Sequence, residues 1–358
     1  REKGIPVISE MEFAARYMGR AKTICITGSN GKTTTTSLIY KILSDAGFNV
    51  ALGGNIGESF AYSVATGEYD WYVLELSSFQ LDGMYRFKAD IAVLMNITPD
   101  HLDRYNYLFQ NYIDSKMRII RNQRSEDSFI WCGDDGTIAK EVERLCPTAA
   151  QSPFGKANIS EGVATVELGG KRVAIELDKL QIKGLHNAYN AMAATLAALA
   201  AGVEPEQILA SLYRFEGVEH RLEKVAIIDG VEWINDSKAT NVDSVWYALE
   251  SMTRPTVWIA GGTDKGNDYD PLKEFVGKKV KTLVCMGVNN SKLIDNFSGI
   301  VPVYNTSSLD EAVQVCRQVA QSGDAVLLSP ACASFDLFKN YEQRGRLFKE
   351  KVLELQKK

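Results

Sequence analysis

The sequence has no long uninterrupted apolar run, which argues against a membrane-spanning helix. Its most apolar long stretch begins at Ala188 and is rich in alanine, but Asn190 interrupts it. We interpret this stretch as a helix packed inside a globular domain. The start of the chain carries no signal-peptide pattern either. We therefore expect a soluble, cytoplasmic protein.

The sequence also lacks paired cysteines, a basic excess and a dinucleotide-binding glycine pattern. No C-x-x-C pair occurs, which favours small buried hydrophobes in a reducing compartment over a disulfide framework. The formal net charge is −5, so nucleic acid is not the expected partner. No G-x-G-x-x-G follows the first predicted strand, which argues against a dinucleotide oxidoreductase. The six cysteines are Cys25, Cys132, Cys146, Cys285, Cys316 and Cys332.

What the sequence does contain is a regular alternation of apolar strands and helices. Its 358 residues, 45% of them apolar, are enough for about two domains with separate cores. Continuous apolar runs bounded by turn signals are typical of a parallel sheet that is covered on both faces. In the first part of the chain we predict helices at about 32–46 and 187–201 and a hairpin within 162–180. The predicted buried strands are 23–27, 71–77, 91–96 and 128–132.

Near residue 217 the alternation starts again, so we expect a second and smaller α/β unit. A hairpin-like pair at 225–229 and 232–236 turns at Gly230. Further predicted strands lie at 257–261, 282–286 and 325–329. We predict helices from about 242, at 309–321, and from about Asp336 to the C-terminus.

A glycine-rich turn joins the first predicted strand to the first long helix, in the order TGSNGKTT. Backbone N–H groups in such a turn, together with the helix N-terminus, can cradle phosphate oxygens. Lys32 would place a positive charge beside the β- and γ-phosphates, and the Thr33 hydroxyl would bind Mg²⁺. The usual G-x-x-x-x-G-K-[ST] spacing is not met, because Ile26 stands five residues before Gly31. A solvated turn is the alternative. The predicted nucleotide-binding residues are Gly28, Ser29, Asn30, Gly31, Lys32, Thr33 and Thr34.

Three ionisable residues follow along the chain. Each has an ordinary explanation alone, and only together do they indicate a ligand site. Glu75 ends one predicted strand and His101 follows the next, and the carboxyl ends of neighbouring strands are where α/β sheets bind ligands. A carboxylate there can hold a metal ion, although a capping or ion-pairing role is the alternative. Lys116 lies in an amphipathic helix, where a solvated lysine is the ordinary interpretation.

Several ordered motifs together make the sequence resemble the Mur ligase family, and within it the D-glutamate-adding branch. The related folylpolyglutamate synthases share the phosphate loop. The resemblance covers essentially the whole chain, and ELSSFQ and SPACASFD favour this branch over its siblings. The motifs are TGSNGKTT (27–34), GGNIG (53–57), ELSSFQL (75–81), N-x-T-x-DHLDRY (96–105), GLHNAYNA (184–191), EHRLE (219–223), NDSKATN (235–241), GGTDKGNDY (261–269) and LLSPACASFDLFKNYEQRG (327–345).

The resemblance implies an ATP-dependent ligase of peptidoglycan precursor synthesis. ATP would phosphorylate UDP-N-acetylmuramoyl-L-alanine to an acyl phosphate, which the amine of D-glutamate would attack. The cofactors would be ATP and two Mg²⁺ ions. Lys32, His101 and Lys116 would be catalytic, and the metal ligands would be Thr33, Glu75, His101 and Lys116, the last as a carbamate.

The same resemblance extends to the ligand-binding residues. ATP would be bound by Asn187, Asn190, Arg221 and Asp236 as well as by the loop. Asn187 and Asn190 are three residues apart and share a helix face, although surface exposure or capping is the alternative for such a pair. Asn55 would line the muramoyl substrate, and Lys238, Thr240, Lys265 and Ser334 would bind D-glutamate. Ser77 and Tyr341 would be further substrate-binding residues.

The predicted fold is α/β, with a central P-loop-type parallel-sheet ATPase domain at 19–216 and a smaller Rossmann-like α/β domain at 217–358. The chain opens at Arg1, and GIPVISEMEFAARYM predicts a short strand followed by a helix; residues 1–18 resemble the end of a UDP-binding first domain. We expect a monomer that binds ATP but adds D-glutamate poorly without that domain. Another Mur ligase, a folylpolyglutamate synthase or a non-catalytic ATP-binding protein on the same scaffold are the alternatives.

Overall fold

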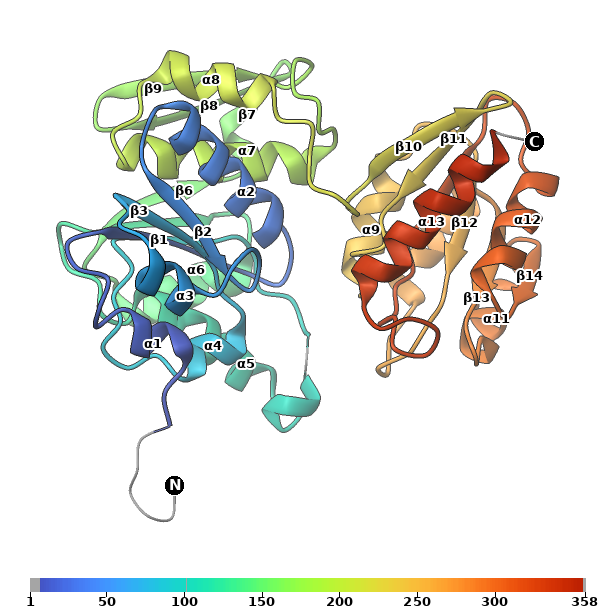
Figure 1. Ribbon diagram of the computed structural model, residues 1–358, viewed down its shortest axis with the longest axis horizontal. Helices are drawn as coiled ribbons and strands as arrows, with labels where there is room; N and C mark the ends of the chain where they lie inside the picture. Colours follow the sequence, from blue (N-terminus) through green and yellow to red (C-terminus); the bar gives the residue numbers. More distant parts are fainter. Residues whose placement is uncertain (1–6, 101, 357–358) are drawn as a thin grey trace. The chain divides into compact units, whose positions relative to one another are not determined.

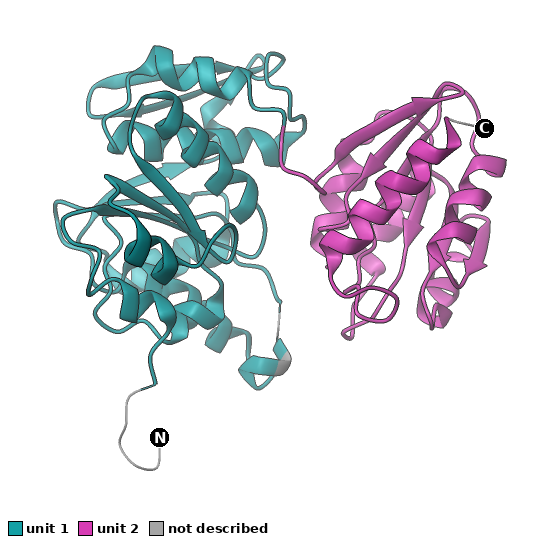
Figure 2. Ribbon diagram, viewed as in Figure 1, with its two compact units in different colours: residues 1–216 teal, residues 217–358 magenta. Residues whose placement is uncertain are grey.

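The computed structural model describes residues 7–100 and 102–356 and divides the chain into two compact units, at 1–216 and 217–358 (Figure 2). Each unit is built on a six-stranded sheet with helices against it. No helix in the described part of the chain has both the length and the apolar character needed to cross a membrane.

The large sheet of the first unit is wholly parallel, in the order β2-β3-β1-β4-β5-β6. β1 lies between β3 and β4, so the chain order reverses at the centre of the sheet. The carboxyl edge of a strand at such a reversal is the usual ligand position in an open α/β sheet. The strands are β1 (Lys22–Thr27), β2 (Val50–Gly54), β3 (Trp71–Glu75), β4 (Ile91–Leu94), β5 (Ser128–Cys132) and β6 (Ala150–Phe154).

Helix α7 (Leu185–Ala200) packs against both this sheet and a second, antiparallel sheet (Figure 1). The second sheet consists of β7 (Ile159–Ser160), β8 (Val163–Leu168) and β9 (Lys171–Glu176). Helix α7 is alanine-rich and buried along most of its length, because it packs on β4, β5 and β6 and also on β8. Helices α2 (Lys32–Asp45) and α8 (Pro205–Tyr213) pack beside it. The other helices of the unit are α1 (Glu10–Ala14), α3 (Phe60–Thr66), α4 (Ser78–Asp82), α5 (Phe109–Met117) and α6 (Gly136–Leu145), with short 3-10 turns at Leu102–Tyr105, Arg118–Ile120 and Lys156–Asn158.

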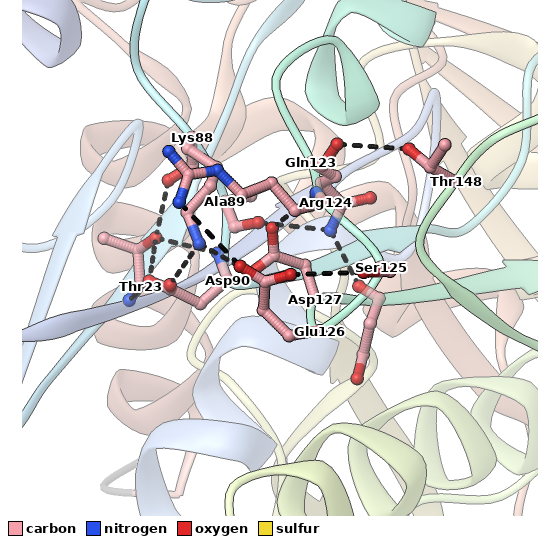
Figure 3. Close-up of polar contacts among 11 residues, drawn as sticks. Thr23, Lys88, Ala89, Asp90, Gln123, Arg124, Ser125, Glu126, Asp127 and Thr148 are labelled. Atoms are coloured by element: carbon pink, nitrogen blue, oxygen red, sulfur yellow. Dashed lines mark hydrogen bonds and ion pairs between the residues drawn. The ribbon is translucent and has the colours of Figure 1, made fainter.

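At the amino ends of β1, β4 and β5 a polar network holds the strands in register (Figure 3). Lys88 Nζ lies 2.8 Å from Asp90 Oδ1 and 2.5 Å from Asp127 Oδ1, and the Thr23 amide donates to Asp90 Oδ2 at 2.8 Å. Gln123 Nε2 donates to the carbonyls of Ala89 and Ser128. Burial favours keeping these charges paired, so the network fixes one end of the sheet and thereby the register at the other end.

The second unit has the strand order β10-β11-β15-β12-β13-β14, in which only β10 is antiparallel. One core cluster lies under α9, α10 and α11, and the other lies under α12 and α13, so the sheet is covered on both faces. The strands are β10 (Glu223–Ile228), β11 (Val231–Asn235), β12 (Thr256–Ala260), β13 (Val280–Met286), β14 (Val303–Thr306) and β15 (Ala325–Leu328). The helices are α9 (Val242–Ser251), α10 (Lys273–Lys279), α11 (Ser291–Phe297), α12 (Leu309–Val319) and α13 (Tyr341–Leu355), with a 3-10 turn at Asp270–Leu272.

The predicted fold class is confirmed, but the predicted start of the C-terminal helix was wrong. The C-terminal helix begins at Tyr341 and not near Asp336, because Asn340 is its N-cap and accepts a hydrogen bond from the Gln343 amide at 2.8 Å. The short strand expected near the start is absent from residues 7–9, and the rest of that stretch lies outside the described residues. The helix expected after it is α1. The elements that were not predicted are strands β2, β6, β7 and β14 and helices α3, α4, α6, α8, α10 and α11.

Candidate functional site

The turn between β1 and α2 is close-packed around two glycines. Gly31 is the N-cap of α2 with φ 82°, and a Cβ there would lie 2.6 Å from Asn190 Oδ1. Gly28 has φ 150°, and its Cβ would lie 2.9 Å from Met95 Cβ. Both positions therefore require glycine for backbone conformation and for space. The result is a tight loop whose backbone comes close to whatever it binds.

Residues that follow β4 hold the outer part of this loop. The Ser29 amide donates to the Asn96 carbonyl at 2.9 Å, and the Asn30 amide donates to Asn96 Oδ1 at 2.7 Å. The Ser29 hydroxyl donates to the Thr98 carbonyl at 2.8 Å. The sequence analysis did not single out Asn96 as a functional residue. The sequence did contain a signal for Asn96, because a polar residue directly after a buried strand lies at the sheet edge where ligands bind.

Lys32 lies over the loop that precedes it. Its Nζ donates to the carbonyls of Gly28 and Ser29, both at 2.8 Å. Thr33 and Thr34 are buried in the first turn of the helix, which contains no acidic residue. A helix N-terminus, a lysine and a glycine loop together form a positive site suited to phosphate.

Lys116 is buried at the same loop, so its interpretation as a solvated lysine was wrong. The residue is 2% exposed, and its Nζ lies 2.8 Å from the Gly28 carbonyl and 3.4 Å from Thr27 Oγ1. Burial and then the positive charge of Lys32 hold the pKa of Lys116 well below its usual range, while Asp100 and Glu75 oppose this shift. Two lysines thus reach the same carbonyl from different helices.

Glu75 ends β3 next to β1 and is 1% exposed. Its Oε1 accepts a hydrogen bond from Asn55 Nδ2 at 2.8 Å, and the Asn55 amide donates to the Glu75 carbonyl, also at 2.8 Å. The strand order therefore brings Asn55 and Glu75 together beside the root of the loop. Ser77 is the N-cap of α4 and forms a capping box with Gln80, so it has a structural role at this edge. His101 lies outside the described residues.

Asn187 and Asn190 are buried, and the alternative of surface exposure was wrong for both. Asn190 Nδ2 donates to Asn187 Oδ1 at 3.0 Å, which confirms that they share a helix face. Asn190 Oδ1 also accepts from Thr35 Oγ1 at 3.2 Å. The pair therefore joins α7 to the phosphate-loop helix.

In the second unit, Asp236 follows β11 and is 4% exposed. Its Oδ2 accepts from the Ser329 hydroxyl at 2.7 Å, and its Oδ1 accepts from the Leu222 amide at 3.3 Å. Burial raises the pKa of Asp236 to about 7, although these hydrogen bonds and the charge of Arg221 oppose the rise. Within the described residues, the buried Nε of Arg221 has no hydrogen-bond partner.

The predicted D-glutamate residues lie on segments that follow β11, β12 and β15. The Thr263 amide donates to the Ala333 carbonyl at 2.8 Å, and the Ala331 amide donates to the Ala239 carbonyl at 3.0 Å. Lys238 Nζ lies 5.2 Å from the centroid of the Tyr341 ring. Ser334 is buried and Lys265 is exposed. Backbone hydrogen bonds thus tie together the segments that carry Thr240, Lys265 and Ser334.

Among the described residues, the one cluster with metal-ligand geometry consists of Glu219, His220 and Glu223. Lys349 Nζ lies 2.9 Å from Glu219 Oε1 and 2.5 Å from Glu223 Oε1. The Lys349 ammonium already lies against both carboxylates where a cation would sit, so we assign no metal to this cluster.

Comparison with known proteins places this arrangement in a family. The family model of the Mur ligase middle domain matches residues 26–198, and that of the Mur ligase glutamate ligase domain matches 220–332. The UDP-N-acetylmuramoylalanine--D-glutamate ligase of Bacteroides fragilis is 53% identical over 99% of this chain and 82% of its own length. The chain belongs to the Mur ligase family. The Porphyromonas gingivalis protein of the same name is 49% identical over 99% of this chain and 80% of its own length.

Solved structures of other Mur ligases and of a related enzyme share the fold. MurF ligase from Thermotoga maritima in complex with ADP has a TM-score of 0.72 at 18% identity, over 96% of this chain and 84% of its own. E. coli FolC in complex with DHPP and ADP has a TM-score of 0.73 at 16% identity, over 100% of this chain and 96% of its own. This Mur ligase chain therefore keeps the fold of proteins with very different sequences.

Proposed function

We propose that this chain is an ATP-dependent ligase that adds D-glutamate to UDP-N-acetylmuramoyl-L-alanine in peptidoglycan precursor synthesis. The observation that carries the proposal is the 53% identity, over 99% of the chain, to a protein of that name. Matches to MurF and FolC are only 16–18% identical, which favours the D-glutamate branch over its siblings. The buried site at the carboxyl edge of β1 supports the ATP-dependent chemistry.

ATP is bound in this proposal by the loop 28–31 and the first turn of α2. The amides of Gly31 and of the first turn of α2, together with the Lys32 ammonium, 2.8 Å from two loop carbonyls, would receive the phosphate oxygens, since the Ser29 and Asn30 amides already donate to Asn96. Asn187 and Asn190 of α7 would bind ATP beside the loop.

The donor set beside the loop fits Mg²⁺, because hydroxyl and carboxylate oxygens are the ligands that this hard cation prefers. Thr33 and the buried carboxylate of Glu75 would hold it, with His101 and a carbamate on Lys116 as further ligands. A carbamate would replace the ammonium, which is costly to bury, by oxygen donors. When bound, Mg²⁺ neutralises the charge that develops on the phosphates.

The reaction brings two anions together and then splits a mixed anhydride. A carboxylate oxygen of the muramoyl substrate attacks the γ-phosphorus of ATP, the bond to the β-bridging oxygen breaks, and ADP leaves. The amine nitrogen of D-glutamate attacks the acyl carbon, the carbon–oxygen bond to phosphate breaks, and an amide forms as the amine loses a proton. Lys32 and the loop amides would stabilise charge on the transferring phosphoryl group throughout.

Isotope transfer tests this route. We expect a substrate labelled with ¹⁸O in its reacting carboxylate to deliver one labelled oxygen to the phosphate that is released. Release of unlabelled phosphate, in step with amide formation, would exclude an acyl phosphate.

A further inference from the structure

Arg344 in α13 is fully buried, which is unusual for arginine. Its guanidinium donates only to neutral acceptors: Nε to Ser237 Oγ at 3.0 Å, Nη2 to the Ser237 carbonyl at 2.8 Å, and Nη1 to the Cys332 carbonyl at 3.3 Å. Over the described part of the chain, no carboxylate forms an ion pair with it. Burial lowers the pKa of Arg344 to about 10, so the group stays charged at neutral pH.

The acceptors of Arg344 lie on the segments that carry the predicted D-glutamate residues. Ser237 directly precedes Lys238, and Cys332 lies two residues before Ser334. The Ser237 hydroxyl also donates to the Tyr341 carbonyl at 2.8 Å. The planar guanidinium has donors in a fixed fork, so one side chain sets the spacing of the segments that carry Ser237 and Cys332.

The charge of Arg344 matters as much as its geometry. Leaving a charge buried without a carboxylate partner costs stability, and such a cost is usually retained for function. D-glutamate brings two carboxylates, and a fixed positive charge in a poorly screened environment attracts them more strongly than an exposed one does. The carboxylates of Asp336 and Asp236 act on Arg344 only from longer range.

We propose that Arg344 is a positioning residue for the amino-acid substrate. It fixes the spacing of segments 237–240 and 332–334 and supplies a buried positive charge beneath them. The assignment of the substrate as D-glutamate rests on the proposed function above.

Kinetics of three variants of the purified full-length enzyme test this role: Arg344→Met, Arg344→Lys and, as a control, Arg346→Lys on the exposed face of the same helix. We expect Arg344→Met to raise the KM for D-glutamate about tenfold or more, and Arg344→Lys about three- to tenfold, because lysine keeps the charge but cannot bridge both segments. The KM for ATP should stay within about twofold in every variant, and Arg346→Lys should change neither KM.

An unchanged KM for D-glutamate in a folded Arg344→Met protein would overturn the proposal. So would parallel rises in both KM values, because a structural defect alone moves them together or lowers kcat only. If Arg344→Met does not fold, the same KM comparison is made with Arg344→Lys and Ser237→Ala. The rise in melting temperature that D-glutamate causes is then measured for both variants and for the wild type. If the wild type uses a different amino acid, the proposed function fails, and the same KM ratio measured with that amino acid still judges the role of Arg344.

Discussion

Several ionisable side chains at the candidate sites are buried and hydrogen-bonded within the protein. Lys116 and Lys32 both donate to the Gly28 carbonyl at 2.8 Å, and Asp236 is buried with hydrogen bonds from Ser329 and Leu222. Sequence reasoning identified these side chains as candidates through their motifs. It could not predict that Lys116 is buried, because an amphipathic helix pattern does not say what covers the polar face. The burial comes from the loop of another strand.

The pKa of Asp236 leads to a stability prediction. Burial raises the pKa of this carboxyl from 3.8 to about 7 in the folded state, so between these values the folded protein binds more protons than the unfolded one. Stability from this group is therefore full at low pH and is lost as pH rises through about 7. We expect Asp236→Asn to remove a pH-dependent loss of roughly 3 kcal/mol between pH 5 and pH 8, because about two pH units of that interval lie below the folded pKa and each contributes about 1.4 kcal/mol.

Urea unfolding at pH 5 and pH 8 measures this effect. The wild type should lose more stability than Asp236→Asn over that interval, and a control, Asp295→Asn on exposed α11, should follow the wild type. Equal losses in the wild type and Asp236→Asn would show that the carboxyl is already ionised at pH 5.

At the scale of elements, the strand–loop–helix unit was predictable from the sequence, but the hydrogen bonds that hold its loop were not. The apolar strand, the glycines and Gly31-Lys32-Thr33 defined β1, the loop and α2 from local sequence alone. The hydrogen bonds from Asn96 depend on β4 lying beside β1, and strand order is not a local property. The start of α13, by contrast, had a local signal that the prediction missed, because Asn340 followed three residues later by Gln343 is a typical helix N-cap pattern.

Gly31 and Gly47 both have a positive φ, and comparing them distinguishes backbone strain from steric crowding at the added Cβ. Gly31 has φ 82° and Gly47 has φ 91°, but only at Gly31 would a Cβ meet another atom, Asn190 Oδ1 at 2.6 Å; at Gly47 there is nothing within 4 Å. We expect Gly47→Ala to lose about 1 kcal/mol of stability and to keep its affinity for ATP. Gly31→Ala should lose more stability and weaken ATP binding by about tenfold or more, because the loop must shift.

Calorimetric titration with an ATP analogue and thermal melting of both variants measure these effects. If Gly31→Ala binds the analogue as tightly as Gly47→Ala does, then close packing of the loop against α7 does not matter for the nucleotide.

At the scale of the whole molecule, each unit places its candidate residues at the carboxyl edge of its own sheet. In the first unit these are the loop, Glu75 and Lys116, and in the second they are Asp236 and the segments joined by Arg344. The α/β class of both units followed from the alternation of apolar strands and helices. The assignment of amino-acid specificity came from motif resemblance, because hydroxyls and lysines at strand ends do not by themselves distinguish one amino acid from another.

The most direct test of the account is therefore ADP formation by the full-length protein with ATP, Mg²⁺, UDP-N-acetylmuramoyl-L-alanine and a panel of amino acids. D-glutamate should support ADP formation, whereas L-alanine, meso-diaminopimelate and D-alanyl-D-alanine should not. ADP formation with one of those three, and none with D-glutamate, would contradict it.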